Sequence, residues 1–318
     1  MIEFKSLSRT PNDSYQNSHY YCDYIELLAL VDCDDGIGIS EVYDRFSEDG
    51  RINGIGSDEG SSEYQKWMGR IENWFVELGG RIVHYGDAYP FYFDGNRLAK
   101  KEVFTEHEKI YLFLLLCSSL SYIQHYHVLT TIFEKLSYFA MKKYLPDIAE
   151  VHIFGVSKNH NERYNGSLLE KFRMLSNDLD LTLSNRHEVF RSGDNGDGGI
   201  DIIAWIPFKN DPNSDRKLIF MGQSASGGNW TNKQASVDRV KNYLVDLPDN
   251  SQNILFVPYD FRNFERKFCQ GGEITASLVF DRYRMLNLIA HDDISNDMVY
   301  EYFQSIMDYV CNFEEDII

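Results

Sequence analysis

The sequence predicts a mixed α/β protein in which a mainly helical N-terminal region precedes a sheet-containing C-terminal domain. Apolar residues recur at helical spacing in the first half of the chain, whereas apolar runs of strand length recur in the second half. A chain of 318 residues is too long for one small core, and its hydrophobic share of 43% is typical of a folded protein. We therefore expect three parts: a helical module at 1–103, a helical connector at 104–150 and an α/β domain at 151–318.

The first part is expected to contain three helices followed by a β-hairpin. Ser40 is a suitable N-cap for a helix over 41–46. The hairpin is expected over 81–85 and 90–93, with a turn through Gly86. The first and third helices are indicated by apolar and aromatic residues: Ile25, Leu27, Leu28 and Leu30, then Tyr64, Trp67, Ile71, Trp74 and Phe75. Three helices followed by a ribbon resemble a winged helix, and a plain helical docking module is the alternative.

The remaining elements alternate between helices and strands. Two apolar helices, 106–121 and 129–144, are expected to form the connector. The α/β domain is then expected to contain a strand at 151–155, a helix at 167–179, strands at 188–190, 200–208 and 217–223, a helix at 229–245, a strand at 253–258 and a final helix at 296–313.

The charge and the cysteine content argue against strong nucleic-acid binding, a disulfide framework and a structural zinc site. The net charge of -18 opposes binding to nucleic acid, but residues 151–285 hold 17 basic and 17 acidic side chains, so this region is neutral. The five cysteines are odd in number and scattered, which argues against a disulfide framework and a structural zinc site. The sequence has no signal peptide and no apolar run long enough to cross a bilayer, so we expect a cytoplasmic protein with no membrane partner.

Two polar residues lie in apolar strands of the predicted sheet. Asp201 follows G-D-G-G-I, and Gln223 ends the strand K-L-I-F-M-G-Q. A carboxylate in such surroundings is costly unless it is paired or binds a metal ion, although Asp201 could also cap the Gly-rich turn. Asp197 is interpreted mainly as a turn residue, because Asp-Gly is common in turns. A carboxylate and an amide oxygen on neighbouring strands can bind one Mg²⁺ ion.

This order of elements and motifs, over about 165–260, resembles the PD-(D/E)XK nuclease superfamily, which has a restriction-endonuclease-like αβββαβ domain. The most similar branch has Gln in its third motif and includes restriction and phage-defence nucleases. The resemblance implies that Asp201 and Gln223 bind the metal ion. The helical Glu of the family is matched best by Glu170, with Glu134 as the alternative.

The chain departs from the family at Ala225, where the third motif has a catalytic Lys. Lys233, in N-W-T-N-K, is the candidate replacement, because a flexible ammonium can reach one site from different backbone positions. The alternative is that cleavage has been lost and the domain only binds.

The resemblance therefore implies a magnesium-dependent DNA endonuclease, with Mn²⁺ as a possible substitute, in a bacterial defence or restriction system. A catalytically degenerate nuclease fold that acts as a binding or assembly subunit is the alternative. Arg262, Arg266 and Lys267 are candidates for DNA-backbone contacts, and a solvated charged face is the other interpretation. Because the chain is acidic, a protein partner or a second copy is expected to supply basic surface.

Overall fold

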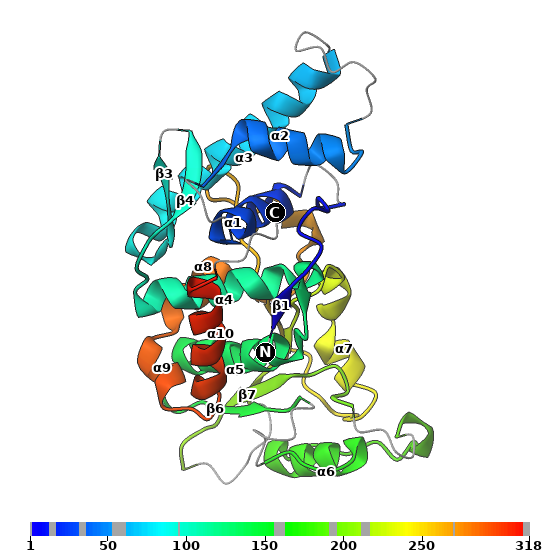
Figure 1. Ribbon diagram of the computed structural model, residues 1–318. Coiled ribbons are helices and arrows are strands. Elements are labelled where there is room, and N and C mark those ends of the chain that lie inside the picture. The colour runs from blue at the N-terminus through cyan, green and yellow to red at the C-terminus, as the bar shows by residue number, and fades with distance from the viewer. Residues whose placement is uncertain are drawn as a thin grey trace. The chain divides into compact units, whose positions relative to one another are not determined.

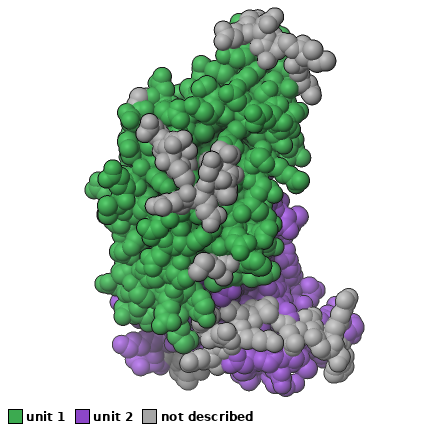
Figure 2. All heavy atoms as spheres, in the orientation of Figure 1, with its two compact units in different colours: residues 1–129, 258–271, 290–318 green, residues 130–257, 272–289 purple. Residues whose placement is uncertain are grey.

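The computed structural model shows a mixed α/β protein that divides into two compact units (Figures 1 and 2). It describes residues 2–12, 17–31, 36–52, 62–94, 96–155, 163–190, 196–210, 217–269 and 271–313. Unit 1 comprises Met1–Leu129, Pro258–Gly271 and Ala290–Ile318, and unit 2 comprises Thr130–Val257 and Gly272–Ile289. The division therefore differs from the expected boundaries at 103 and 150. It falls within helix α5 (His127–Tyr144), and the C-terminal segment belongs to unit 1.

Unit 1 contains three helices and a three-stranded antiparallel sheet near its N-terminus. The elements in chain order are α1 (Ser18–Val31), β2 (Ile37–Gly38), α2 (Ile39–Glu48), α3 (Ser62–Tyr85), β3 (Phe91–Asp94) and β4 (Arg97–Lys100). The strand order is β2-β4-β3. Unit 1 also contains β1 (Glu3–Phe4) paired with β5 (Ile123–Gln124), and helices α4 (Glu106–Ser118), α9 (His291–Ser295) and α10 (Tyr300–Cys311).

The predicted first strand of the hairpin, 81–85, is wrong, because these residues form the last turns of α3. Leu78, Arg81 and Tyr85 continue the buried stripe of Ile71 and Trp74 at helical spacing. The actual hairpin pairs β3 with β4. The predicted cap at Ser40 is also wrong. Helix α2 begins after Gly38, whose backbone N–H donates to the Glu41 carboxylate at 3.1 Å.

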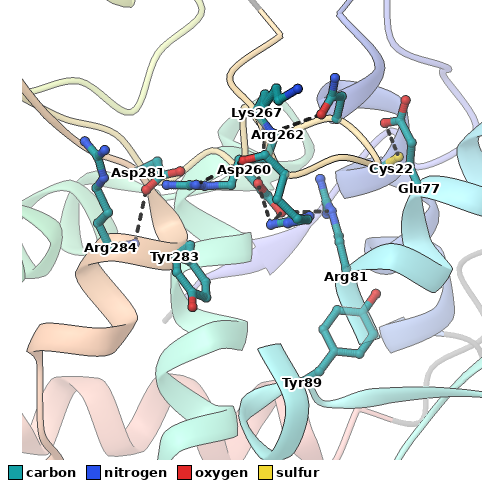
Figure 3. A network of polar contacts seen from close by, with 12 residues as sticks. Cys22, Glu77, Arg81, Tyr89, Asp260, Arg262, Lys267, Asp281, Tyr283 and Arg284 are labelled. Atoms are coloured by element: carbon teal, nitrogen blue, oxygen red, sulfur yellow. Dashed lines mark hydrogen bonds and ion pairs between the residues drawn. The ribbon is translucent and has the colours of Figure 1, made fainter. Parts of the chain in front are cut away.

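A buried ionic network lies in unit 1 around Arg81 of α3 (Figure 3). Its guanidinium contacts Asp23 at 2.7 Å and Glu26 at 2.9 Å, both on α1. It also lies 3.5 Å from Asp260, which belongs to the 258–271 segment. Asp260 is paired in turn with Arg266 at 3.1 Å. The 258–271 segment leaves the sheet of unit 2 after one strand and returns before the next, and this network fixes it within unit 1.

Unit 2 is built on a five-stranded mixed sheet with the order β10-β9-β8-β7-β6. The neighbours β6–β7 and β7–β8 are antiparallel, whereas β8–β9 and β9–β10 are parallel. The strands are β6 (Glu150–Ile153), β7 (Ile202–Ile206), β8 (Leu218–Ser224), β9 (Gln252–Phe256) and β10 (Leu278–Phe280); the helices are α5 from Thr130 onward, α6 (Leu168–Leu179), α7 (Ser236–Val240) and α8 (Arg282–Leu288).

Alternate residues of the central strands face two different layers, as a pleated sheet requires. One face packs against α6 and α7 in a core that includes Ile203, Trp205, Ile219, Met221, Phe172, Leu175, Val237 and Val240. On the other face, Tyr144 of α5 packs edge-on against Phe280 of β10, with 5.1 Å between the ring centroids. Gly222 leaves room there for Phe256, whose ring would lie 2.9 Å from an added Cβ.

Two predictions for unit 2 are corrected by the structure, and one strand was missed. Residues 188–190 do not form a strand, and His187–Val189 is a single 3-10 turn. The helix expected over 229–245 is instead a short 3-10 helix, η4 (Trp230–Lys233), followed by the short α7 and turns. Strand β10 was not expected. Among the described helices, none is long and apolar enough to cross a membrane.

Candidate functional site

The candidate site lies at one edge of the sheet of unit 2, where β6 ends, β7 begins and β8 ends. The backbone N–H groups of Phe154 and Gly155 donate to the Asp201 carbonyl at 2.7 and 3.1 Å. The Asp201 N–H donates to the carbonyl of Gly222 at 2.9 Å. Because neighbouring antiparallel strands place the end of one beside the start of the next, these segments meet at Asp201.

Asp201 is buried at this edge, with 9% of its surface exposed. One of its carboxylate oxygens, Oδ2, accepts a hydrogen bond from the backbone N–H of Ser224 at 2.7 Å. The side chain is therefore fixed to the end of β8.

Glu134, the alternative to Glu170, lies beside Asp201. It projects from α5 over Gly155, where an added Cβ would lie only 2.1 Å from Glu134 Oε1. Only glycine allows the carboxylate this close to the backbone. Glu134 Oε1 is buried and has no hydrogen-bond partner in the part of the chain that the structure describes. A buried carboxylate oxygen without a partner is costly, and it indicates a position built for a ligand.

The structure corrects the preference for Glu170, which closes the capping box of α6. Its carboxylate accepts from the backbone N–H of Ser167 at 2.7 Å and from the Ser167 hydroxyl at 2.8 Å. These two bonds lower the pKa of Glu170. The side chain is on the exposed face of the helix, so it cannot serve as the ligand from α6.

The next residue, Lys171, points inward because one step along a helix rotates the side chain by about 100°. Lys171 is 4% exposed, and its ammonium donates to the carbonyls of Gly155 at 3.2 Å, Phe154 at 3.4 Å and Gly196 at 3.5 Å. It thereby joins the end of β6 to the turn before β7. The sequence signal was its place between Leu168 and Leu175 on the apolar stripe of α6, a position that sequence reasoning overlooked.

A cavity of about 400 Å³ opens beside Asp201 and Glu134. Lys233 also lines it and donates from Nζ to the carbonyl of Ser224 at 3.3 Å. The Ser224 hydroxyl oxygen is buried and has no hydrogen-bond partner within the described segments. The lining residues are Thr130, Thr131, Phe133, Glu134, Asp201, Ser224, Ser226 and Lys233. The cavity therefore combines two carboxylates, one ammonium and several hydroxyls.

Gln223 is buried, but it does not line this cavity. Its side-chain oxygen accepts a hydrogen bond from Arg239 of α7 at 3.0 Å. Successive residues of a strand point to opposite faces, so Gln223 and the lining residue Ser224 are directed apart. In the structure Gln223 therefore contacts α7 and lies outside the cavity lining, so its role as a metal ligand stays a prediction.

Burial and nearby negative charges raise the pKa values of both site carboxyls. Burial and then the charges of Asp201 and Asp197 raise the pKa of Glu134 to about 8. Burial and then Asp197 raise the pKa of Asp201 to about 7, against the opposing effects of the Ser224 N–H and Lys233. The turn role expected for Asp197 is confirmed, since its carboxylate accepts from the Gly199 N–H at 2.7 Å. Its charge nevertheless acts on both site carboxyls.

Lys171 shows the opposite effect. Burial lowers its pKa, and the nearby charges of Asp197 and Glu134 only partly oppose this. The raised pKa values of Glu134 and Asp201 mean that protons or a cation are favoured at these carboxyls.

The three residues expected to contact DNA have other partners. Arg266 is paired with the buried Asp260, and Lys267 with Glu265 at 2.8 Å. Arg262 donates to the carbonyl of Arg266 at 3.2 Å. All three belong to the 258–271 segment of unit 1, whereas the cavity belongs to unit 2. The local contacts explain their placement without DNA.

The donor set at the cavity fits a hard divalent cation. No three His, Cys, Asp or Glu side chains converge as a metal-binding group among the described residues. Mg²⁺, however, is commonly held by one or two carboxylates and keeps several of its waters. Glu134 and Asp201 supply two carboxylates, and Ser224 supplies neutral oxygen.

Comparisons with known proteins give no relative from which a role could be transferred. No family model, curated protein or solved structure matches the chain. The functional interpretation therefore depends on the residues and geometry of the site.

Proposed function

We propose that unit 2 is a magnesium-dependent endonuclease domain that hydrolyses phosphodiester bonds of DNA. One observation carries this proposal. Glu134 of α5 and Asp201 of the sheet face the same cavity as Lys233, and Glu134 Oε1 is buried there with no hydrogen-bond partner among the described residues. This is a cation-binding pair of carboxylates beside a positive side chain that can approach a phosphate.

The order of elements around the cavity supports the resemblance to the PD-(D/E)XK superfamily. Without α6, the chain runs α5-β6-β7-β8-α7-β9, which is an αβββαβ order. In this order of elements, α6 is an insertion between β6 and β7. The helical Glu is then supplied by Glu134, which precedes β6, and not by Glu170.

Each charged residue of the site has a distinct proposed task. Glu134 and Asp201 would hold Mg²⁺, or Mn²⁺ in its place. The bound cation would activate a water molecule and polarise a phosphoryl oxygen. Lys233 neutralises the negative charge that develops on the phosphate in the transition state. Lys171 holds the backbone of Gly155, over which the Glu134 carboxylate lies.

The N-terminal elements support a winged-helix interpretation of unit 1. Their order, α1-β2-α2-α3-β3-β4, combines three helices with a sheet of order β2-β4-β3. We propose that this region contacts DNA or a protein partner and that the chain acts in a bacterial defence or restriction system.

The proposal is tested by incubating the full chain with supercoiled and linear DNA in Mg²⁺ or Mn²⁺. The wild type is expected to cleave, whereas Glu134→Gln and Lys233→Met should cleave far more slowly, with only residual activity. Glu170→Gln is the matched control, because it removes the same charge from an exposed helix cap and should cleave like the wild type. Cleavage that survives Glu134→Gln but not Glu170→Gln would contradict the assigned site.

Absence of cleavage by the wild type, with DNA alone or with a candidate partner, would favour the alternative. The domain would then be a degenerate nuclease fold that serves as a binding or assembly subunit. The net charge of -18 is the observation that suits this alternative, because it weakens the attraction to DNA.

A further inference from the structure

Lys233 lies on a short piece of secondary structure that cannot fix its own conformation. It is the last residue of η4, one 3-10 turn that lacks a side-chain hydrogen bond at its N-cap. Single turns are marginal without tertiary contacts. The Lys233 ammonium nevertheless reaches the Ser224 carbonyl at 3.3 Å, so neighbouring residues must hold the turn in place.

The next residue, Gln234, supplies such contacts. It is 4% exposed, although an uncharged polar side chain is costly to bury without partners. Its Nε2 donates to the carbonyls of Thr231 at 3.2 Å and Glu273 at 2.7 Å. Its Oε1 accepts from the backbone N–H groups of Thr275 at 2.8 Å and Ala276 at 3.1 Å.

These four bonds use both donors and both acceptor sites of the amide. They join η4 to the 273–276 segment that precedes β10. At the other end of η4, Trp230 is buried with 2% of its surface exposed. The turn is thus anchored at both ends, and Lys233 lies between the anchors with its side chain lining the cavity.

We propose that Gln234 is a positioning residue for Lys233, a role that rests on the function proposed above. Gln234 does not line the cavity, and its four hydrogen bonds go to backbone groups and not to either carboxylate of the site. It acts by fixing the backbone from which the Lys233 ammonium reaches the phosphate. Loss of its amide would leave the turn free to move while Glu134 and Asp201 keep their places.

Two substitutions remove this effect in different ways. Gln234→Met keeps the length of the side chain but removes all four hydrogen bonds. Gln234→Glu keeps the shape, but it places a carboxylate oxygen against the carbonyls of Thr231 and Glu273. If Gln234→Met fails to fold, Gln234→Glu provides the same test with smaller loss of packing.

The first readout does not require activity. Lysine acetylation at limiting reagent, followed by mass spectrometry, reports how accessible and reactive the amine of each lysine is. Lys233 is expected to react several-fold faster in either variant than in the wild type. Lys241, which is exposed at the C-terminal end of α7, is the internal reference and should keep its rate. Unchanged reactivity of Lys233 in a folded variant would overturn the proposal.

The second readout is a double-mutant cycle on cleavage. Gln234→Met is expected to lower kcat by about 10-fold to 100-fold, as small misplacements of a catalytic group do. The affinity for Mn²⁺ should stay unchanged, and Gln234→Met combined with Lys233→Met should cleave no worse than Lys233→Met alone. Additive losses, or weaker Mn²⁺ binding, would show a general structural role instead.

The two proposals can fail separately. A wild type that never cleaves nucleic acid contradicts the nuclease function, whereas the acetylation rates still decide whether Gln234 positions Lys233.

Discussion

Both units bury carboxylates, but they balance them in opposite ways. In unit 1, Glu26 is fully buried and accepts hydrogen bonds from the Tyr89 hydroxyl at 2.6 Å and the Tyr111 hydroxyl at 2.9 Å. It is also paired with Arg81. Burial alone would lower the pKa of Arg81, but the charges of Glu26 and Asp23 raise it above its ordinary value. The cluster is thus satisfied by the protein itself.

In unit 2, the two lysine side chains of the site donate hydrogen bonds to backbone carbonyls and not to the carboxylates. Lys171 donates to the end of β6, and Lys233 donates to Ser224. The carboxyls of Glu134 and Asp201 are left with raised pKa values, because no paired cation among the described residues offsets their burial. A buried cluster that balances its own charge serves stability, and one that does not is poised for a ligand.

The largest expected effect is in the satisfied cluster. Arg81→Met removes the cation shared by Asp23, Glu26 and Asp260, and breaking a buried ion pair costs about 3–5 kcal/mol. Urea unfolding monitored by circular dichroism should show this loss. Stability within about 1 kcal/mol of the wild type would show that the network contributes little and would remove the contrast.

The next effect concerns activity and not stability. Asp201→Asn is expected to lower the rate of cleavage by about 100-fold or more, because it removes one of the two carboxylates proposed to bind the cation. The free energy of unfolding should not fall, since the substitution relieves repulsion with Asp197. If Asp201→Asn lost stability together with activity, the carboxyls of unit 2 would serve stability as those of unit 1 do.

A smaller effect is expected from pH and cation together. The folded pKa values of Glu134 and Asp201, about 8 and about 7, lie above their ordinary values of 4.5 and 3.8. The stability contributed by these protonated carboxyls is therefore complete below pH 4 and is lost as the pH rises toward 8.

A divalent cation replaces the protons, so Mn²⁺ should raise the melting temperature more at pH 8 than at pH 6. At a concentration of 100 times Kd the gain is about 2.7 kcal/mol when the site is fully deprotonated. Differential scanning fluorimetry at the two pH values measures it. An equal shift at both values would indicate binding elsewhere.

The smallest effect is expected at Glu170. Glu170→Ala removes the capping-box bonds to Ser167, so the melting temperature should fall slightly. Cleavage and cation binding should not change. A loss of cleavage or of cation binding would show that Glu170 belongs to the site after all.

Local patterns predicted much of the fold, but not the partners of the site residues. The helix expected at 167–179 corresponds to α6, and the strands expected at 200–208 and 217–223 correspond to β7 and β8. The end of α3 was wrongly predicted as a strand. Local sequence does not show that the polar Arg81 is buried, because its partners Asp23 and Asp260 are distant in sequence.

The choice between Glu134 and Glu170 shows the limit most clearly. Both residues lie in similar apolar helical surroundings, so local sequence does not separate them. What separates them is tertiary structure: Glu134 fits over Gly155, whereas Glu170 is engaged by Ser167. Gln223 was likewise assigned by motif position, yet Arg239 of the following helix binds it.

The central claim is that Glu134 and Asp201 together bind one divalent cation. Isothermal titration with Mn²⁺ at pH 8 tests it most directly, using the wild type, Glu134→Gln and Glu170→Gln. We expect one Mn²⁺ ion per chain in the wild type and in Glu170→Gln, and an affinity at least about 10-fold lower in Glu134→Gln. Equal affinity in Glu134→Gln and the wild type would contradict the account.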